Sequence, residues 1–402
     1  MNPDLKLLKS QLERELVNIL SYWKENVVDE KYGGFLGKID HYNRIIDDGS
    51  KGVVLNARIL WTFSFAYNFL QDRQYLDLAE RVYQYLVDHF WDKENGGLFW
   101  ELDYKGNVIN DRKQIYAQGF GIYGFSEYFK ASGNKDSLDY AVKLFELTEK
   151  HAFDPVYGGY IEALGGKWEK LEDMRLSPKD ANEPKSMNTH LHLLEPYTNL
   201  YRYLKDERLK KQIAGLTNIF LNRIIDPESF HFQLFFGEDW SVRSSITSYG
   251  HDIEGAWLMY EATEVIQDHK LMEKVGEVAL RMVDVTINEG MDSDGSIIYE
   301  RDTVTGHIDR DKHWWPQAET LVGLMNAFEI SGNDKYLEIL VKTWQFIYEK
   351  MIDRKNGEWF WRVDEKGNPV DTEDKAGFWK CPYHNSRALV EVLTRLEKNK
   401  LV

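Results

Sequence analysis

Cysteine is almost absent from this chain of 402 residues, which contains only Cys381. One cysteine cannot form an internal disulfide, and such a composition fits a reducing compartment. The N-terminal stretch MNPDLKLLKSQLERELVNIL alternates charged residues with leucines at helical spacing and lacks the continuous apolar block of a secretory signal peptide. We therefore expect a cytoplasmic protein.

Long apolar runs and an excess of positive charge are also missing. No run of about 18 apolar residues is free of charged side chains, so no transmembrane helix is expected. The 50 lysines and arginines are outnumbered by 66 aspartates and glutamates, which gives a formal net charge of -16. Such a protein would on average repel phosphate backbones and anionic lipids. The composition therefore argues against binding to nucleic acid or to a membrane.

Aromatic and other apolar residues, by contrast, are abundant. Phe, Trp and Tyr make up 14% of the chain, with 13 Trp and 23 Tyr, and hydrophobic residues make up 43%. This content can supply the core of one large domain. Aromatic rings either fill such a core or form flat walls against which the C–H faces of sugars stack. We expect most of these rings in the core.

A turn followed by an aromatic, strand-like run occurs six times. The six stretches are EKYGGFLGKID (30–40), DKENGGLFWELD (92–103), DPVYGGYIEAL (154–164), DPESFHFQLFF (226–236), DSDGSIIYERD (292–302) and DRKNGEWFWRVD (353–364). Counted from Gly33, the matching positions Gly96, Gly158, His231, Gly295 and Gly357 are separated by 63, 62, 73, 64 and 62 residues. A regular spacing of this size is typical of repeat architectures.

Segments with apolar residues at i, i+3 and i+4 lie between these turns and predict two amphipathic helices per repeat. Examples are 57–70, 76–90 and 336–351. The tripeptide Ser-Gly-Asn, at 132–134 and again at 331–333, supplies a Gly that can end one helix and an Asn that can start the next.

Six helical hairpins can stack as an open solenoid or close into a ring. An open array needs polar capping repeats, whereas the first and last repeats here keep the same aromatic turn as the others. We therefore predict an all-α fold, an (α/α)6 barrel of six helical hairpins with short β-hairpin-like aromatic turns, formed by residues 1–402 as one domain. The only irregular insert, 165–187, is rich in Gly, Pro and charge and predicts a long loop.

Polar or aromatic side chains recur near the predicted start of the first helix in each repeat. They are Asn56 and Arg58, Tyr116 and Gln118, His192, His251, Trp315 and His384. From Arg58 to Gln118 the separation is 60 residues, and the following separations are 74, 59, 64 and 69, of which the first contains the long insert. In a closed ring, one point per repeat on the inner helices converges on a central pocket. The pattern therefore predicts one shared site.

A metal site is one interpretation of this set. His192 and His251, each followed three residues later by a glutamate, could join His384 and a Glu around a single ion. Di-metal helical proteins use the opposite order, Glu-x-x-His. His190 and His192 cannot both face inward, because two residues turn an α-helix by about 200°, so we expect one of them to be structural. The single-metal site stays open as an alternative.

Proton transfer is the interpretation that we favour. Histidine titrates near neutrality without help, and three histidines fall in phase with the repeat. Glu254 and Glu319 could hold their tautomers, and Arg58 could stabilise a developing oxyanion. This set suits abstraction of a proton beside a carbonyl group and its return. One acid/base group contributes typically about 10²–10⁴-fold, so its loss or the loss of Arg58 should nearly abolish turnover.

Two other classes of protein stay open. Glycosidases also occur on (α/α)6 barrels and need two carboxylates about 5–10 Å apart, a role that Glu254 and Glu319 could fill. That reading leaves the histidines and Arg58 without a role. A non-catalytic carbohydrate-binding barrel would need aromatic walls but not this concentration of titratable groups.

Five motifs resemble the N-acylglucosamine 2-epimerase superfamily. They are LNARILW (55–61), MNTHLHLLEPYTNLYR (187–202), SYGHDIEGAWLM (248–259), WWPQAETLVG (314–323) and FWKCPYHNSR (378–387). The last four are most similar to its cellobiose 2-epimerase branch, and the likeness covers residues 5–395. It implies an (α/α)6 barrel, in agreement with the repeat count.

The resemblance implies reversible inversion of C2 in the reducing-end glucose of β-1,4-linked disaccharides. Cellobiose would become glucosyl-mannose and lactose would become epilactose, by deprotonation and reprotonation through a cis-enediolate. No cofactor and no metal ion are implied. The alternative within the superfamily is an N-acylglucosamine 2-epimerase or a mannose/glucose isomerase. The expected partner is a disaccharide, and we expect a monomer or a weak homodimer.

The resemblance also implies roles for individual residues. In the catalytic set, His251 and His384 would be the acid/base pair on opposite faces of C2, Arg58 would steady the enediolate, His192 would hold sugar hydroxyls and Glu254 would orient its neighbours. The substrate-binding set is Tyr116, Asn188, Asp180, Trp315, Glu319 and Trp379. Its two tryptophans would stack on sugars, and Asp180, in the long insert, would touch the non-reducing sugar.

Overall fold

The computed structural model describes residues 3–402 and contains twelve α-helices in that range; residues 1–2 of the predicted domain lie outside it. The helices are α1 (Pro3–Asn26), α2 (Val53–Leu70), α3 (Arg73–Tyr85), α4 (Ile115–Ser132), α5 (Lys135–His151), α6 (Met187–Leu204), α7 (Glu207–Ile219), α8 (Tyr249–Ile266), α9 (His269–Gly290), α10 (Trp314–Ser331), α11 (Lys335–Phe346) and α12 (Tyr383–Lys398). None of these helices is long and apolar enough to span a bilayer.

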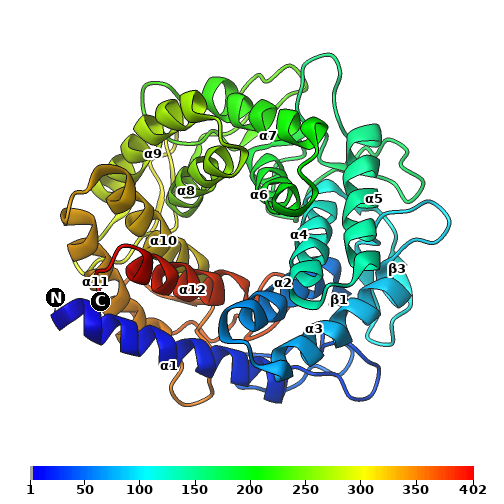
Figure 1. Cartoon of the computed structure of the whole chain (residues 1–402), viewed down its shortest axis with the longest axis horizontal. Coiled ribbons are helices and arrows are strands. Elements are labelled where there is room, and N and C mark those ends of the chain that lie inside the picture. The colour runs from blue at the N-terminus through cyan, green and yellow to red at the C-terminus, as the bar shows by residue number, and fades with distance from the viewer. Residues whose placement is uncertain (1–2) are drawn as a thin grey trace.

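The even-numbered helices form an inner ring, and the odd-numbered helices lie around it (Figure 1). Each inner helix contacts the next, from α2 through α4, α6, α8 and α10 to α12, and α12 contacts α2 again. The ring is therefore closed, and the structure confirms the predicted (α/α)6 barrel.

The two ends of the chain meet to form the sixth helical hairpin. The N-terminal helix α1 packs against α12 and α11, and both termini lie close together in Figure 1. The indole Nε1 of Trp23 donates to Glu358 Oε2 at 2.6 Å, and Lys380 Nζ donates to Glu358 Oε1 at 2.7 Å. One buried carboxylate of the sixth turn thus joins α1 to the segment that precedes α12.

Inner and outer helices differ in burial because the inner ring is covered on both sides. Helix α2 is buried without a break from Val53 through Ser64, and α4 from Ile115 through Tyr128. The outer helix α5 instead buries only separate positions along one side. The amphipathic pattern predicted for 57–70 is therefore wrong, because a helix enclosed on all sides has no solvent-facing stripe.

A short link joins each of several inner helices to the outer helix that follows. Gly133 and Gly332 end α4 and α10 with φ of 72° and 67°, a left-handed conformation that glycine adopts without steric cost. The side chain of Asn134 then accepts hydrogen bonds from backbone N–H groups at the start of α5. The same capping role is played by Asp72, Asp206 and Asp268. The prediction from Ser-Gly-Asn is confirmed at 132–134.

Twelve short strands in the described range flank the turns. They are β1 (Lys51–Gly52), β2 (Glu101–Leu102), β3 (Val108–Asn110), β4 (Lys113–Gln114), β5 (Ala163–Leu164), β6 (Lys185–Ser186), β7 (Phe235–Phe236), β8 (Ile246–Ser248), β9 (Glu300–Asp302), β10 (Ile308–Asp309), β11 (Lys312–His313) and β12 (Arg362–Val363). They pair antiparallel in five small sheets, ordered β1-β2-β3, β10-β9-β8, β11-β12, β4-β5 and β6-β7. In β1 and β2, Lys51 lies opposite Leu102.

A β-bridge closes each of the six aromatic turns. The paired residues are Val28 with Phe35, Trp91 with Leu98, Phe153 with Tyr160, Ile225 with Phe232, Met291 with Ile297, and Ile352 with Trp359. The structure therefore confirms six hairpin-like turns. In the fourth turn Phe230, with φ of 61°, donates its N–H to Asp226 O as Gly158 does to Asp154 O. The sequence match on His231 is thus wrong by one residue, because a phenylalanine takes the left-handed position of the turn glycine.

A buried lysine anchors five of the six turns to the segment that leads into an inner helix. Each lysine donates to the aspartate that begins its turn, at 2.6–3.0 Å: Lys51 to Asp29, Lys113 to Asp92, Lys185 to Asp154, Lys312 to Asp292 and Lys375 to Asp353. These contacts fix the turns against the first residues of the inner helices. The repeat therefore positions the same end of five of the six inner helices, and α8 is the exception.

Outer helices and the insert complete the fold. Three outer helices end in one π-helical turn, and these turns are η1 (Leu86–Phe90), η2 (Phe220–Ile224) and η3 (Ile347–Met351). The insert contains no helix or strand from 165 to 184. This confirms the predicted loop except for its last three residues, which form β6 and begin α6.

Candidate active site

The in-phase positions lie within the first two turns of the inner helices. Arg58 is on α2, Tyr116 on α4, His192 on α6, His251 on α8, Trp315 on α10 and His384 on α12. Arg58 Nη2 donates to the hydroxyl of Tyr116 at 2.6 Å, and the Tyr116 ring lies 5.0 Å from that of His192. On the other side, the Trp315 ring lies 4.6 Å from His251 and 5.8 Å from His384. We call this end of the barrel the active-site mouth.

Each of the three in-phase histidines has its Nδ1 atom held by the protein. The pairs are His192 Nδ1 with Glu195 Oε2 at 3.0 Å, His251 Nδ1 with Ser248 Oγ at 2.8 Å, and His384 Nδ1 with Glu319 Oε1 at 2.7 Å. Within residues 3–402 no hydrogen bond reaches Nε2 of any of the three. An ionised carboxylate accepts a hydrogen bond from Nδ1–H, which leaves the lone pair of the ring on Nε2.

His190 and His192 have different surroundings, as predicted. His190 Nε2 accepts a hydrogen bond from the backbone N–H of Tyr160 at 2.9 Å, and its Nδ1 lies 2.6 Å from Ser186 O. Both nitrogens of His190 are thus engaged within the protein, Nε2 with the third turn and Nδ1 with the N-cap residue of α6. His190 is the structural histidine, and His192 faces the active-site mouth.

A kink in α6 sets the position of His192. Its backbone has φ of -88° and ψ of 15°, outside the helical range, and Pro196 follows four residues later. A proline lacks the N–H that would bond to the carbonyl four residues earlier, and its ring crowds that carbonyl. The displaced His192 carbonyl approaches Gly119 of α4, where a Cβ atom would lie 2.3 Å from His192 O. Gly119 therefore permits the close contact of α4 with the kink.

Arg58 is a buried cation without a carboxylate partner. The side chain is 3% exposed, and within the described range it takes part in no ion pair. Its guanidinium carbon lies 4.2 Å from the ring centre of Phe120 and 5.0 Å from that of Tyr383. Aromatic faces offset part of the cost of burying a cation. The guanidinium thus stays available for an anion that enters the mouth.

A second buried cation, Arg387 of α12, lies among three glutamates. Its Nη2 donates to Glu254 Oε1 at 2.9 Å and to Glu319 Oε1 at 2.7 Å, and its Nη1 donates to Glu195 Oε1. The hydroxyl of Tyr383 also donates to Glu195 Oε1. All three glutamates and Arg387 are at most 4% exposed. We call Arg387, Glu195, Glu254 and Glu319 the carboxylate cluster.

Burial and neighbouring charge shift the pKa values of these groups in opposite directions. Burial and the nearby carboxylates raise the pKa of Glu254 well above its usual value and also raise that of Glu319, with Arg387 opposing both shifts. For Glu195 burial is outweighed by Arg387 and His192, which hold its pKa at about 2. Burial lowers the pKa of His251 to about 3. It also lowers the pKa of His384, with Arg58 and Arg387 acting in the same direction.

The carboxylate cluster also bears on a metal site. Glu254, Glu319 and His384 place possible ligand atoms within 4.8 Å of one another. However, Arg387 already donates to Glu254 Oε1 and Glu319 Oε1, and His384 Nδ1 shares the latter oxygen. A guanidinium supplies there the positive charge that a metal ion would supply. These residues therefore fit an ion-pair network better than a metal site.

The same geometry bears on hydrolysis. A glycosidase needs its two carboxyl groups on either side of the scissile bond, about 5–10 Å apart. Glu254 and Glu319 are 1% and 0% exposed and bond to the same nitrogen of Arg387. No sugar can lie between two carboxylates that share one nitrogen. In this arrangement the two glutamates therefore cannot act together as the acid and base of a glycosidase.

The remaining predicted site residues lie nearer the surface. Trp315 and Trp379 are partly exposed, and the Trp379 ring is 6.1 Å from that of Tyr116. Asn188, in the first turn of α6, has a buried Oδ1 without a hydrogen-bond partner among the described residues. Asp180 lies in the long loop, where its Oδ2 accepts from Ser177 N at 2.8 Å. Its hydrogen bonds stay within that loop and do not join it to the other site residues.

The predicted site left out two members of the carboxylate cluster, although Glu195 was considered in the metal interpretation. Glu195 follows His192 by three residues in HLLE, and Arg387 follows His384 by three residues in HNSR. Residues three apart lie on one face of a helix, so each could have been assigned to the same face as its histidine. The signal for Arg387 is the need for a cation near several inward-facing glutamates.

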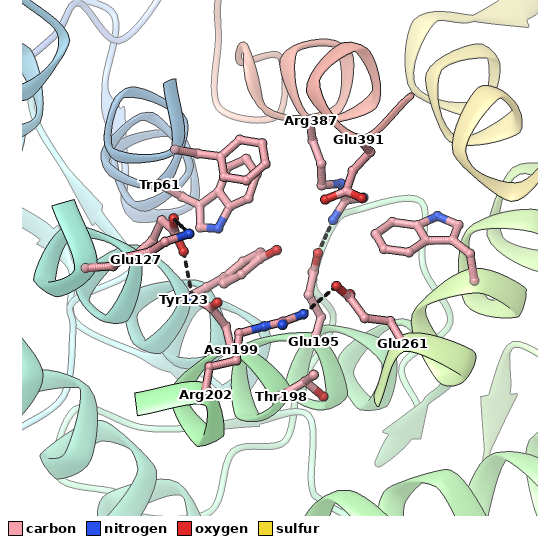
Figure 2. A pocket seen from close by; sticks show the side chains of 13 residues that line it. Trp61, Tyr123, Glu127, Glu195, Thr198, Asn199, Arg202, Glu261, Arg387 and Glu391 are labelled. Carbon is pink, nitrogen blue, oxygen red and sulfur yellow. Dashed lines mark hydrogen bonds and ion pairs between the residues drawn. The ribbon is translucent and has the colours of Figure 1, made fainter. Parts of the chain in front are cut away.

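A cavity of roughly 260 Å³ lies on the far side of the carboxylate cluster, farther along the same inner helices (Figure 2). Its lining includes Trp61, Tyr123, Asn199, Arg202, Glu261 and Glu391. Glu195 and Arg387 line it as well, and Figure 2 shows the hydrogen bond between them at the wall of the cavity. The cluster therefore separates the active-site mouth from this far-side cavity.

Comparison with known proteins indicates the same family as the sequence motifs. The family model described as N-acylglucosamine 2-epimerase (GlcNAc 2-epimerase) matches residues 34–388. The chain is 48% identical to cellobiose 2-epimerase of Bacteroides fragilis, over 96% of this chain and 99% of that protein. It is 39% identical to cellobiose 2-epimerase of Dictyoglomus turgidum, over 98% of this chain and 100% of that protein.

Solved structures agree with the sequence matches. The structure of cellobiose 2-epimerase from Bacillus thermoamylovorans aligns with a TM-score of 0.93 and 37% identity, over 97% of this chain and 100% of that one. The family match covers most of the inner ring, including all six in-phase positions. The chain therefore belongs to the N-acylglucosamine 2-epimerase family and is a carbohydrate epimerase, an enzyme of the isomerase class.

Proposed function

We propose that the chain inverts C2 of the reducing-end glucose of β-1,4-linked disaccharides without a cofactor. Cellobiose would become glucosyl-mannose and lactose would become epilactose. The relatives named above carry cellobiose in their names, which supports this substrate class. The observation that carries the proposal is the division of the mouth into a proton-transfer side and a charge-stabilising side.

His251 and His384 form the proton-transfer side. They lie on α8 and α12, and Trp315 on the intervening α10 stands between them, with its ring 4.6 Å from one and 5.8 Å from the other. Burial lowers the pKa of both histidines, so both are neutral at physiological pH and can accept a proton. A sugar ring beside Trp315 would have one Nε2 near each face of C2. One histidine removes the C2 proton and later releases it to water. The other takes up a proton from water once the enediolate has formed, because the nearby negative charge raises its pKa, and donates that proton to the opposite face of C2.

Arg58, Tyr116 and His192 form the charge-stabilising side, on α2, α4 and α6. Removal of the C2 proton leaves a cis-enediolate with negative charge on its oxygens. Arg58 is charged and without a carboxylate partner, and it is oriented by Tyr116 at 2.6 Å. A preorganised cation that faces developing charge lowers the barrier without reorganising during the reaction. His192 would hold a sugar hydroxyl through its free Nε2.

The other predicted residues are proposed to bind and orient the substrate. Trp315 and Trp379 would stack on sugar rings, because their partly exposed faces flank the mouth. The unpartnered Oδ1 of Asn188 would accept from a hydroxyl group. Glu319 and Glu254 would fix the orientation of His384, and Asp180 would contact the non-reducing sugar from the long loop.

Exchange of the C2 hydrogen with solvent tests the mechanism. Incubation with cellobiose in D2O should give an epimer that carries one deuteron at C2, because a deprotonated carbon takes its new proton from a group in exchange with water. NMR of the product measures this directly. An epimer that keeps its original hydrogen at C2 in every molecule would exclude the proton-transfer mechanism.

Matched incubations distinguish the competing functions. His251→Asn should lower turnover of cellobiose by about 10²–10⁴-fold, whereas His269→Asn, on the exposed start of α9, should not change it.

Release of free glucose would indicate a glycosidase, and loss of activity on chelation that zinc or manganese restores would indicate a metal enzyme. Faster conversion of mannose or N-acetylglucosamine than of cellobiose would indicate another branch of the family.

We also propose that the chain is one catalytic domain that acts as a monomer or weak homodimer in the cytoplasm. Its buried apolar residues form one large cluster around the ring, with a small second cluster of Tyr249, Ile297 and Ile298. The single cysteine supports a reducing compartment. Sedimentation of the purified protein would establish its oligomeric state.

A further inference from the structure

Arg387 is connected to two of the in-phase histidines through carboxylates. Glu195 accepts from Arg387 Nη1 with Oε1, and its Oε2 lies 3.0 Å from His192 Nδ1. Glu319 Oε1 lies 2.7 Å from both Arg387 Nη2 and His384 Nδ1. One guanidinium thus orients, through two carboxylates, imidazoles on α6 and α12.

The other contacts of these carboxylates leave them little freedom. The second oxygen of Glu319 accepts from Trp257 Nε1 at 3.1 Å. Glu195 Oε1 also accepts from the hydroxyl of Tyr383. The planar guanidinium presents its donors in a fixed fork, so it sets the directions of both carboxylates at once. A lysine ammonium at the same place could not bond to all of them.

We propose that Arg387 is a positioning residue for the reaction: acting through Glu195 and Glu319, it fixes the tautomers and orientations of His192 and His384 and keeps Nε2 of each free for the substrate. The proposal rests on the proposed epimerase function for its kinetic consequences. It assigns to Arg387 no contact with substrate, since the guanidinium lies behind the carboxylates and lines the far-side cavity (Figure 2).

The physical reason is the balance of charge in the cluster. Three carboxylates lie around one cation. Arg387 opposes the rise of the Glu254 and Glu319 pKa values more strongly than any other group, with a smaller contribution from Trp257 for Glu319. Without it, mutual repulsion and burial favour protonated carboxyl groups. A protonated Glu319 donates to Nδ1 of His384 and drives the imidazole proton to Nε2. The histidine then loses the lone pair that accepts the C2 proton.

Groups on five of the six inner helices contribute to the electrostatic surroundings of Arg387. They are Tyr123 on α4, His192 and Glu195 on α6, Glu254 on α8, Glu319 on α10, and Tyr383 and His384 on α12. Of these, the carboxyl groups and the two histidines, whose pKa values burial lowers, titrate on the acidic side, and Arg387 acts to lower the pKa of each. The acid limb of the kcat profile therefore reports the carboxylate cluster together with His192 and His384.

Two variants of Arg387 give different expected results. Arg387→Ala should lower kcat by about 10²–10³-fold with little change in KM, and should move the acid limb of kcat to higher pH by about one unit or more. Arg387→Lys keeps a positive charge but not the fork. Its acid limb should stay near that of the parent, while kcat falls about tenfold.

The far-side cavity makes chemical rescue possible. Its roughly 260 Å³ opens next to the place that Arg387→Ala would vacate. Guanidinium ion at about 50 mM, far below denaturing concentrations, should raise kcat of Arg387→Ala by about tenfold and return the acid limb toward the parent value. Equal concentrations of sodium chloride and urea serve as controls for ionic strength and for solvation.

Arg395 supplies a matched control on the same helix. It is 8% exposed and pairs with Glu329 and Glu391 at 2.6 and 3.1 Å, away from the active-site mouth. Arg395→Ala also removes a mostly buried guanidinium from α12. It should lower thermal stability but leave kcat and the acid limb unchanged, and guanidinium should not increase its rate.

A measurement without substrate separates this proposal from the proposed function. In the ligand-free parent protein, ¹⁵N NMR of labelled histidine should show His192 and His384 protonated at Nδ1 and not at Nε2. Arg387→Ala should move protonation toward Nε2. If the parent fails to epimerise cellobiose, the proposed function is wrong; if it does epimerise cellobiose while the Arg387 variants keep their acid limb and histidine spectra, the role of Arg387 is wrong.

Discussion

Arg58 shows how the site departs from the rule that buried charges are paired. The side chain is 3% exposed, bonds to one tyrosine hydroxyl, lies beside the buried thiol of Cys381 and otherwise contacts aromatic rings. Burying a cation without a carboxylate costs stability, because the desolvation penalty is only partly offset. We interpret this cost as the energetic basis for binding a transient anion.

Replacement of Arg58 by methionine should therefore separate stability from activity. Arg58→Met fills similar volume without charge, and we expect the free energy of unfolding to rise by about 1–2 kcal/mol. Turnover of cellobiose should fall by about 10³-fold, because the proposed enediolate would lose its cation. Thermal unfolding and steady-state kinetics measure the two effects.

The paired arginine on α12 is the control for this stability prediction. Arg395 bonds to Glu329 and Glu391, so Arg395→Met leaves two carboxylates without their cation and should lower the unfolding temperature. A lower unfolding temperature for Arg58→Met as well would show that its aromatic contacts compensate fully for desolvation.

At the scale of residues, periodicity predicted those positions that the repeat places. His192, His251 and His384 could be assigned to one pocket because each begins an inner helix. Helix spacing places Glu195 and Arg387 on the same faces as His192 and His384, but it does not predict the bond between them, because that bond depends on α6 and α12 facing each other across the ring. Asp180 lies in the long loop, and no periodicity determines where a loop residue points.

Helix α6 is the element whose irregularity matters most to the site. Pro196 disrupts the helix at His192, and the displaced carbonyl packs against Gly119 of α4. A regular helix would place the His192 side chain and carbonyl differently. The kink is therefore a structural cause of the position of His192 in the active-site mouth.

Gly119→Ala tests whether the kink of α6 sets the position of His192. A Cβ atom there would lie 2.3 Å from the His192 carbonyl oxygen, so α6 must move away from α4. We expect kcat to fall by about tenfold or more, because misplacement by about 1 Å costs up to about 10²-fold. Kinetics with cellobiose and the ¹⁵N spectrum of His192 provide the measurement.

Gly121→Ala is the matched control in the same helix. Its Cβ atom would meet side-chain carbons of Leu98 and Leu144 at 2.5 and 2.7 Å, and these can rotate away where a backbone carbonyl cannot. We expect a loss of stability but a small change in kcat. Equal losses of kcat in the two variants would mean that tight packing of α4, and not the α6 kink, controls the rate.

At the scale of elements, the sequence predicted the six turns and the helices between them. The sequence did not predict that α2 is buried on all sides, because an apolar 3.6-residue pattern does not show whether a second layer covers the helix. The left-handed backbone conformation of Phe230 could not be predicted from the sequence either. The composition of that turn lacks glycine, and only the hydrogen bond from Phe230 N to Asp226 O identifies its position.

The whole molecule is held closed by contacts between its two ends. Six similar turns predicted a ring, but the order of turns alone did not show that the sixth hairpin combines α1 with α12. The reason is that an outer helix precedes the first turn and an inner helix ends the chain. Closure therefore depends on pairings across more than 300 residues, such as Trp359 Nε1 donating to Glu15 Oε1 at 2.8 Å.

Glu15 makes this closure dependent on pH. Burial raises its pKa from 4.5 to about 7, against the hydrogen bonds from Trp359 and Asn18. The folded state thus favours the protonated form, so the stabilisation is complete below pH 4.5 and is lost as the pH rises through about 7. At about 1.4 kcal/mol per pKa unit, the loss is at most about 3.5 kcal/mol.

Glu15→Gln keeps the shape of the side chain but removes this titration. The variant should match the parent at pH 4.5 and unfold about 2–4 °C higher than the parent at pH 8, because only the parent then carries a buried charge. Glu13→Gln changes an exposed carboxylate of the same helix and should alter the unfolding temperature by less than about 1 °C at either pH. Thermal unfolding of the parent and both variants at the two pH values measures these differences. A Glu15→Gln effect of equal size at both would mean that Glu15 is ionised throughout, and that α1 is held by a charged hydrogen bond to Trp359 and not by a neutral one.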